Sequence, residues 1–153
     1  MTDGRRLWLH GTWSTVKLAG NETGGRLAVL EEELPEGPGP PLHSHPQDET
    51  YVLLDGDATF WIDADPAEER GLRCGAGAVV FVPGGIWHTY RVESPLLRLL
   101  VLSTPAGLED YVLALGTPDA QAPEPSRRRL AAVARELGVV IHGPPPAATA
   151  AGA

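Results

Sequence analysis

Short apolar segments recur through roughly the first two thirds of the chain, and most of them alternate apolar and polar positions. Alternation with a period of two is typical of half-buried β-strands. Turn residues separate the segments, as at Asp55-Gly56-Asp57. The pattern predicts strands over residues 7–10, 13–18, 26–34, 49–54, 59–62, 71–74, 79–82, 87–92 and 96–102. Short strands at this spacing indicate an all-β sandwich or barrel.

After residue 103 the apolar period becomes that of a helix. We expect a first helix with Thr104 as its N-cap and Pro105 as its first residue, ending at Gly116. Ser126 is the expected N-cap of a second helix that ends before Gly138. The sequence therefore predicts a β-barrel over residues 1–103 and a helical extension over 104–142. Residues 139–141 form a short strand or docking segment, and the Pro/Ala-rich residues 143–153 form a disordered tail.

Composition excludes several classes of protein. Lysine and arginine number 12 against 20 acidic residues, for a net charge of −8, which argues against binding to nucleic acid or to an anionic membrane. Cys74 is the only cysteine, so an intrachain disulfide is excluded, as suits a reducing cytoplasm. We find neither a leader sequence nor a membrane-spanning apolar run, and we expect a soluble, cytoplasmic protein.

Three histidines and one glutamate are the strongest chemical signal. His43 and His45 lie two residues apart and face the same way on a strand, and Glu49 shares their parity. An extended chain would carry Glu49 roughly 13 Å past His45, so Pro46-Gln47-Asp48 must turn the chain. His88 follows a second apolar strand and the break Pro83-Gly84-Gly85. These side chains are the nitrogen and oxygen donors that transition metals prefer.

Other residues compete for the same role. Asp48 could replace Glu49 as the carboxylate ligand, but its parity is wrong for the histidine face. His10 and His142 lie outside the two stretches, and we interpret both as non-ligands. A run of three arginines, 127–129, belongs to the second expected helix and is interpreted as a solvated face.

The spacing of these residues resembles that of the cupin superfamily, and in particular small quercetin-dioxygenase-like cupins. The stretch from Gly37 through His43, His45 and Glu49 to Gly56 matches the first cupin motif, and the stretch from Gly77 through Pro83 to His88 matches the second. Together the motifs cover residues 37–56 and 77–92. The second motif commonly ends in asparagine where this chain has Val92. The difference affects a supporting hydrogen bond and leaves the ligand set intact.

The resemblance implies a double-stranded β-helix, or jelly-roll, barrel. It also implies one divalent transition metal per chain, which is iron, nickel, manganese, cobalt or zinc, held by His43, His45, Glu49 and His88. Small cupins commonly pair as homodimers, so residues 7–18 are candidate strands to cross to a neighbour.

The function we expect first is a metal-dependent dioxygenase acting on an enolic or phenolic aromatic small molecule, with Glu49 as both ligand and general base. One alternative is a non-oxidative metal-dependent isomerase or polyketide cyclase. A second alternative is a cupin that binds a small molecule without turnover. Residues whose parity or position suggests a place in the substrate pocket are Tyr51, Leu53, Phe60, Trp61, Phe81 and Tyr90.

Overall fold

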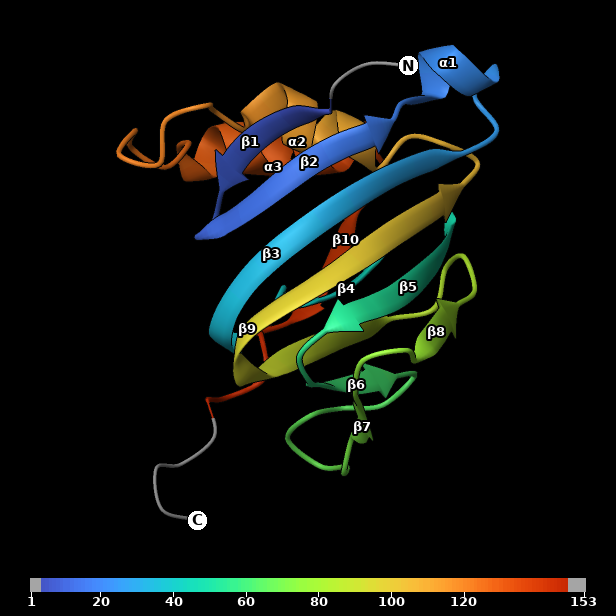
Figure 1. Ribbon diagram of the computed structural model, residues 1–153, viewed down its shortest axis with the longest axis vertical. Coiled ribbons are helices and arrows are strands. Elements are labelled where there is room, and N and C mark those ends of the chain that lie inside the picture. The colour runs from blue at the N-terminus through green and yellow to red at the C-terminus, as the bar shows by residue number, and fades with distance from the viewer. Residues whose placement is uncertain (1–3, 149–153) are drawn as a thin grey trace.

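The computed structural model describes residues 4–148 of the chain (Figure 1). Most elements are strands: β1 (Arg5–Leu9), β2 (Thr12–Leu18), β3 (Ala28–Pro38), β4 (Leu42–Ser44), β5 (Asp48–Asp55), β6 (Ala58–Ile62), β7 (Leu72–Cys74), β8 (Val79–Val82), β9 (His88–Thr104) and β10 (Val140–Gly143). The helices are α1 (Gly20–Thr23), α2 (Glu109–Leu115) and α3 (Arg127–Glu136).

The strands form two antiparallel layers that share the long strand β9. In one layer the order is β1-β2-β3-β9-β5-β8, in which the second half of β9 takes part. In the other layer the order is β10-β4-β9-β6-β7, and here β9 contributes its first half. Within the described residues the outer strands of the layers do not pair with each other, so the sheet curls without closing. The predicted all-β jelly roll with C-terminal helices is confirmed.

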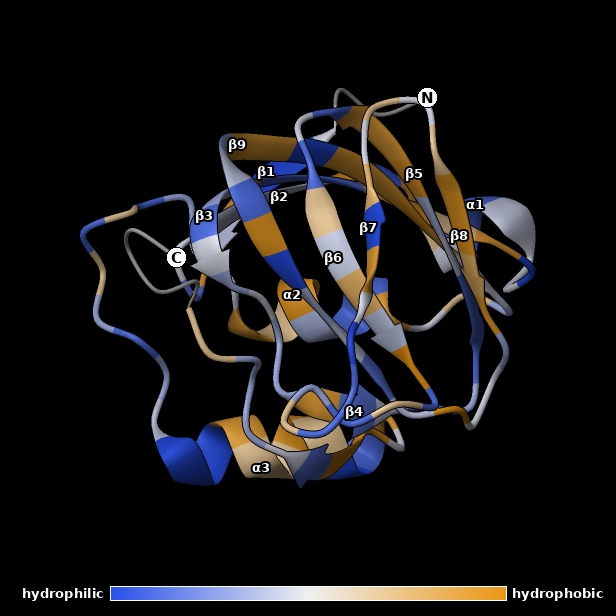
Figure 2. Cartoon of the chain, turned by 90° about the horizontal axis from the view of Figure 1, so that it is seen from below, coloured by the Kyte–Doolittle hydropathy of each residue, from blue (hydrophilic) through white to orange (hydrophobic). Residues whose placement is uncertain are grey.

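Alternation of side chains across each strand explains why the layers pack. Figure 2 shows this alternation along β9 as bands of opposite hydropathy. Inward residues of β5 and β9, such as Leu53, Leu97 and Leu99, are essentially fully buried. Burying one such leucine contributes roughly 1.5–3 kcal/mol to folding. The core between the layers therefore fixes the register of the strands that carry the candidate site.

Two predictions about strand ends were wrong. Residues 88–92 and 96–102 belong to one strand, β9, because both halves pair with β3, and the polar residues 93–95 between them lie at a register shift of that ladder. Thr104 is the last residue of β9 and pairs with Asp48, so it cannot cap a helix. Helix α2 begins instead at Glu109, whose carboxylate accepts backbone N–H bonds from Gly107 at 2.7 Å and from Gly20 at 2.8 Å.

The C-terminal segment returns to the sheets. α2 packs against β1, β3 and α3, and the predicted cap of α3 is confirmed by the Ser126 hydroxyl, which accepts from the Arg129 N–H at 3.2 Å. β10 then pairs with β4, as the short strand expected there. Beyond it, the carbonyl of Ala147 accepts a hydrogen bond from Arg91, and residues 149–153 of the expected disordered tail lie outside the described residues. No helix among residues 4–148 is long and apolar enough to cross a membrane.

Replacing Gly56 with alanine is expected to destabilise the fold more than the same change at Gly77. Both glycines have a φ of +89°, which strains any other residue. A Cβ at Gly56 would also collide with the backbone carbonyl of Leu96, whereas a Cβ at Gly77 meets open space. We expect Gly77→Ala to lower the free energy of unfolding by about 1 kcal/mol and Gly56→Ala by about 3 kcal/mol. Denaturant unfolding measures both, and equal losses would contradict the close approach of Gly56 to the Leu96 carbonyl.

Candidate metal centre

Four side chains, from three neighbouring strands and the turn after one of them, converge on one point. His43 lies in β4 and pairs directly with His88 at the start of β9, while Glu49 lies in β5. His45 follows β4, and the chain turns between it and Glu49, as predicted. One ligand atom from each residue lies within 4.8 Å of those from the other three. His45, Glu49 and His88 are buried, and His43 is partly buried.

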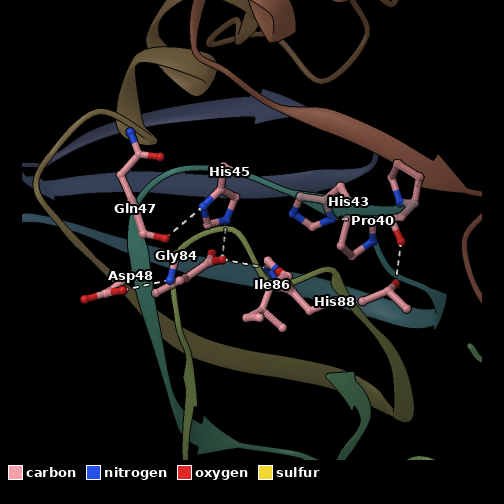
Figure 3. Close-up of polar contacts among 11 residues, drawn as sticks. Pro40, His43, His45, Gln47, Asp48, Gly84, Ile86 and His88 are labelled. Carbon is pink, nitrogen blue, oxygen red and sulfur yellow. Dashed lines mark hydrogen bonds and ion pairs between the residues drawn. The ribbon is translucent and has the colours of Figure 1, made fainter. Parts of the chain in front are cut away.

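Each imidazole is held by a backbone carbonyl. The Nδ1 atoms contact the carbonyl oxygens of Pro41 (2.7 Å, from His43), Gln47 (3.1 Å, from His45) and Ile86 (3.0 Å, from His88). Figure 3 shows how His45, His43 and His88 are arranged around these contacts. A carbonyl oxygen only accepts, so each Nδ1 carries the proton and donates it. In the neutral ring each Nε2 is then a free lone pair, which is the form that binds a metal.

The contacts at Glu49 test whether the site fits a cation. Nε2 of His45 lies 2.7 Å, and Nε2 of His88 lies 2.9 Å, from the same carboxylate oxygen of Glu49. Because each neutral Nε2 is an acceptor, lone pairs face lone pairs unless a proton or a metal ion lies among them. Three imidazole nitrogens and one carboxylate oxygen in a buried cluster match the donor set of a divalent transition metal. The residues present therefore fit the metal that the sequence predicts.

Electrostatics keep the ligands in their metal-binding forms. Burial raises the pKa of Glu49. In the metal-free site a proton held between Glu49 and Nε2 of His45 or His88 makes hydrogen bonds that outweigh burial and hold this pKa below its ordinary value. Burial, followed by the nearby charge of His88, lowers the pKa of His43 to about 4. Near neutral pH Glu49 is thus a carboxylate and His43 a neutral imidazole, so neither must lose a proton before a metal binds.

The rejected ligand candidates lie elsewhere. The carboxylate of Asp48 accepts the backbone N–H of Gly84 at 2.7 Å and points away from the cluster (Figure 3). His10 contacts Glu124 at 3.0 Å, and His142 contacts the Ser44 hydroxyl at 2.8 Å. None of these three residues belongs to the four-residue cluster found in the described part of the chain.

A cavity of about 530 Å³ adjoins the cluster. His43, His45 and Glu49 form part of its wall, and apolar residues such as Leu30, Leu34 and Val101 form much of the rest. α2 and α3 also contribute, through Val112 and Leu130 among others, so the C-terminal segment covers the cavity. A volume of this size accommodates a drug-sized ligand.

The six expected pocket residues divide into three groups. Tyr51 and Tyr90 line the cavity. Leu53 and Phe60 face inward but belong to the packed core, where the Phe60 ring lies 5.2 Å from those of both tyrosines. Trp61 and Phe81 form the third group.

The expectation that Trp61 and Phe81 face inward was wrong. In β8 the inward positions are those of Val80 and Val82, so Phe81 between them faces outward and is 55% exposed. Trp61 is buried on the outer side of β6, where its indole N–H donates to the Glu69 carbonyl at 2.9 Å. Parity fixed the face of each residue, but the sequence alone did not say which parity was inward.

Glu32 and Ser14 are polar residues of the cavity wall that the sequence analysis did not identify. Glu32 in β3 shares the parity of Ala28, Leu30 and Leu34, all of which are buried. Ser14 in β2 is the cross-strand partner of Glu32. The signal was an acidic residue at an inward position within an apolar alternating row, a pattern that strands rarely contain without a functional reason.

The pKa values of the cavity groups reflect their burial. Burial, and secondarily the charge of Glu49, raises the pKa of Glu32 to about 7. Burial also raises the pKa of Tyr51 and of Tyr90 well above its ordinary value, with further contributions from the charges of Glu49 and Glu32 respectively. Both tyrosines are therefore protonated at neutral pH and can donate hydrogen bonds into the cavity.

The part of the chain that carries the cluster matches a known protein family. Residues 30–104, which contain all four residues of the cluster, match the cupin domain family. The chain is a cupin. Val92, where the second cupin motif commonly has asparagine, is buried in the core, so an apolar contact takes the place of the expected hydrogen bond.

Known relatives of this cupin have different activities. Quercetin 2,3-dioxygenase of Bacillus subtilis strain 168 is 26% identical over 117 residues, which are 76% of this chain and 33% of that protein. Dimethylsulfoniopropionate lyase DddQ of Ruegeria pomeroyi is 36% identical over 76 residues, which are 50% of this chain and 36% of that protein. The cupin thus matches only about a third of the length of either relative.

A solved structure of a Bacillus subtilis oxalate decarboxylase variant has a similar fold. It aligns with a TM-score of 0.60 and 18% sequence identity over 71% of this chain and 29% of that chain. At this level of identity the likeness is one of fold alone.

The raised pKa of Glu32 predicts a dependence of stability on pH in the metal-free protein. A carboxyl group whose pKa rises on folding, here from 4.5 to about 7, stabilises the fold below the lower value and loses that contribution as pH rises through the higher one. Glu32→Gln should therefore be more stable than the wild type at pH 8, by at most about 3 kcal/mol at about 1.4 kcal/mol per pKa unit. This advantage should shrink as the pH approaches 4.5. Denaturant unfolding at several pH values measures the difference, and a difference independent of pH would contradict the burial of this charge.

Proposed function

We propose that this cupin is a metal-dependent dioxygenase that acts on an enolic or phenolic aromatic small molecule. The observation that carries the proposal is the position of the ligand cluster, in the wall of a largely apolar cavity of about 530 Å³. The similarity to a quercetin 2,3-dioxygenase supports an oxidative reaction over a non-oxidative one.

His43, His45, His88 and Glu49 would hold the ion. A bound transition metal supplies Lewis acidity, which lowers the pKa of a substrate hydroxyl, and open positions for substrate and dioxygen. The carbonyls of Pro41, Gln47 and Ile86 keep the imidazoles aligned, so the ligand geometry needs little rearrangement when substrate arrives.

Glu49 also has the position of a proton acceptor. As a ligand of the ion, Glu49 would have its lone pair engaged and would be a weak base. A buried carboxylate that turns away from its partners keeps only the effect of burial, which raises its pKa and makes it a better acceptor. Glu49 would thus take the proton of a substrate hydroxyl when it gives up its contact in the ligand cluster for a contact with that hydroxyl.

The rest of the cavity suits an aromatic body. The rings of Tyr51 and Tyr90 lie 5.5 Å apart at a steep angle and form one aromatic surface beside the ligands. Apolar residues of β3 and β9, with residues of α2 and α3, line much of the rest of the cavity. A substrate that displaced water from this space would strengthen the electrostatic contacts and protect reactive species from hydrolysis.

Non-oxidative chemistry is the second candidate function. The observation in its favour is that protonated tyrosine hydroxyls and the Glu32 carboxylate line the same cavity. Such groups donate and accept protons, which a lyase, isomerase or cyclase requires. The partial similarity to a lyase is consistent with it.

A homodimer and a cytoplasmic location remain predictions. β1 and β2 pair within their own chain, next to β3. The outer faces of β5 and β8 expose Leu54, Val79 and Phe81, an apolar surface suited to a protein contact.

Dioxygen uptake tests the proposed function. Protein loaded separately with iron, nickel, manganese or cobalt is mixed with a panel of flavonols and other enolic aromatics. We expect uptake that requires both metal and substrate and that falls by at least about 100-fold in Glu49→Gln, because a ligand and a proton acceptor are both altered. Asp48→Asn is the matched control, since that neighbouring carboxylate is bound to Gly84, and it should retain uptake.

Two outcomes would count against the proposal. If no substrate gives uptake although each chain binds its metal, the dioxygenase assignment fails. If a substrate is converted at the same rate under strict anaerobiosis, the reaction is non-oxidative and the second candidate replaces the first.

A further inference from the structure

The carboxylate of Glu32 has few partners for a charge inside a protein. Among the residues that the structure describes it forms no ion pair, and it contacts only the Ser14 hydroxyl, at 3.3 Å, and the hydroxyl of Tyr90. Its neighbours Glu31 and Glu33 face the other side of β3, where they pair with Arg98, Lys17 and Arg6. The available cations thus lie on the outer face, and the inward carboxylate has none.

A carboxylate offers about four acceptor positions, so two hydroxyl contacts leave accepting capacity unused. Glu32 is part of the cavity wall, and the space against it is the cavity. Retaining such a group in a fold is unfavourable, as the rise of its pKa to about 7 through burial indicates. A ligand that donates a hydrogen bond would supply the compensation that the chain lacks.

The surroundings of Glu32 form a polar region distinct from the metal ligands. Thr12 and Ser14 of β2 line the cavity on this side, and leucines 30 and 34 flank Glu32 along β3. The metal ligands come from β4, β5 and β9.

The tyrosine pair adjoins both carboxylates. Tyr90 interacts chiefly with Glu32 and Tyr51 chiefly with Glu49, and the ring centroids of the two tyrosines lie 5.5 Å apart. The cavity therefore has two polar regions, near enough for the charge of Glu49 to act on Glu32, with an aromatic surface beside both.

We propose that Glu32 and Ser14 form a second substrate subsite, which binds a hydroxyl or amine donor on the part of the substrate that does not reach the metal. The substrate is then an aromatic molecule with a metal-binding oxygen at one end and a hydrogen-bond donor at the other. This inference rests on the proposed function for the metal-binding end, and it adds the specificity at the other end. Glu32 acts by orienting the substrate, and a ligand without the donor leaves its carboxylate unpaired.

Binding of matched probes tests the subsite without turnover. The protein is loaded with zinc, which has no redox chemistry, and titrated with three probes followed by fluorescence or calorimetry. The probes are unsubstituted flavonol and its derivatives with a hydroxyl or an aminomethyl group at the para position of the pendant ring. We expect the wild type to bind at least one derivative about tenfold more tightly than the parent compound, which corresponds to one hydrogen bond to a charged group. A gain for the aminomethyl probe alone would identify a cationic donor.

Variants of neighbouring residues assign the preference to Glu32. Glu32→Leu should bind the parent flavonol as the wild type does and lose the preference, while Glu32→Gln should keep part of it because an acceptor oxygen remains. Glu33→Gln, on the outer face of the same strand, is the matched control and should keep the full preference. Zinc content and the unfolding midpoint of each variant show that the fold and the metal site are intact.

Several results would overturn the inference. They are equal affinities for all three probes in the wild type, no binding of any probe to the zinc-loaded protein, a preference that survives in Glu32→Leu, or loss of zinc from Glu32→Leu. This test measures binding in the absence of oxidation, so its failure leaves the dioxygen-uptake result standing. Absence of uptake would in turn leave the subsite result standing.

Discussion

The fixed orientation of three imidazole rings is the constraint on which the site depends. His43, His45 and His88 each donate Nδ1–H to a backbone carbonyl two residues away, which turns the Nε2 atoms toward Glu49. These short-range bonds hold only while the backbone keeps its course around the ligands, and that course is set by the pairing of β4 with β9 and by the turn before β5. Metal affinity and fold stability are therefore linked: a change that shifts these strands would also misalign the lone pairs.

The fold places two carboxylates in one cavity and gives them opposite properties. Glu49 is stabilised as an anion by two imidazoles, so its pKa falls, whereas Glu32 has only hydroxyl partners, so burial raises its pKa to about 7. Neighbouring groups with displaced pKa values are typical of functional sites. The difference supports our proposals that Glu49 binds the metal and that Glu32 contacts the substrate. Glu49 is buried beside the imidazoles, whereas Glu32 is partly buried and faces the cavity.

Local patterns in the sequence predicted most of the fold and the ligand cluster. Period-two alternation gave the strands, and the spacing from His43 to Glu49 required the turn that the structure contains. Features that depend on long-range pairing were not predictable. The polar stretch inside β9 looks like a loop until the pairing of its two flanking segments with β3 is known, and Thr104 looks like a helix cap until it pairs with Asp48. The outward direction of Phe81 and the inward direction of Glu32 follow from which face of each strand meets the other layer, a global property of the sheet.

X-ray absorption at the metal edge of the reconstituted protein tests the central claim most directly. The account predicts one ion per chain, with three imidazole nitrogens and one carboxylate oxygen at about 2.0–2.2 Å, and loss of one imidazole from this set in His88→Ala. A first shell without imidazole scattering, or a spectrum unchanged by removing His88, would contradict the assignment of the cluster as the metal centre.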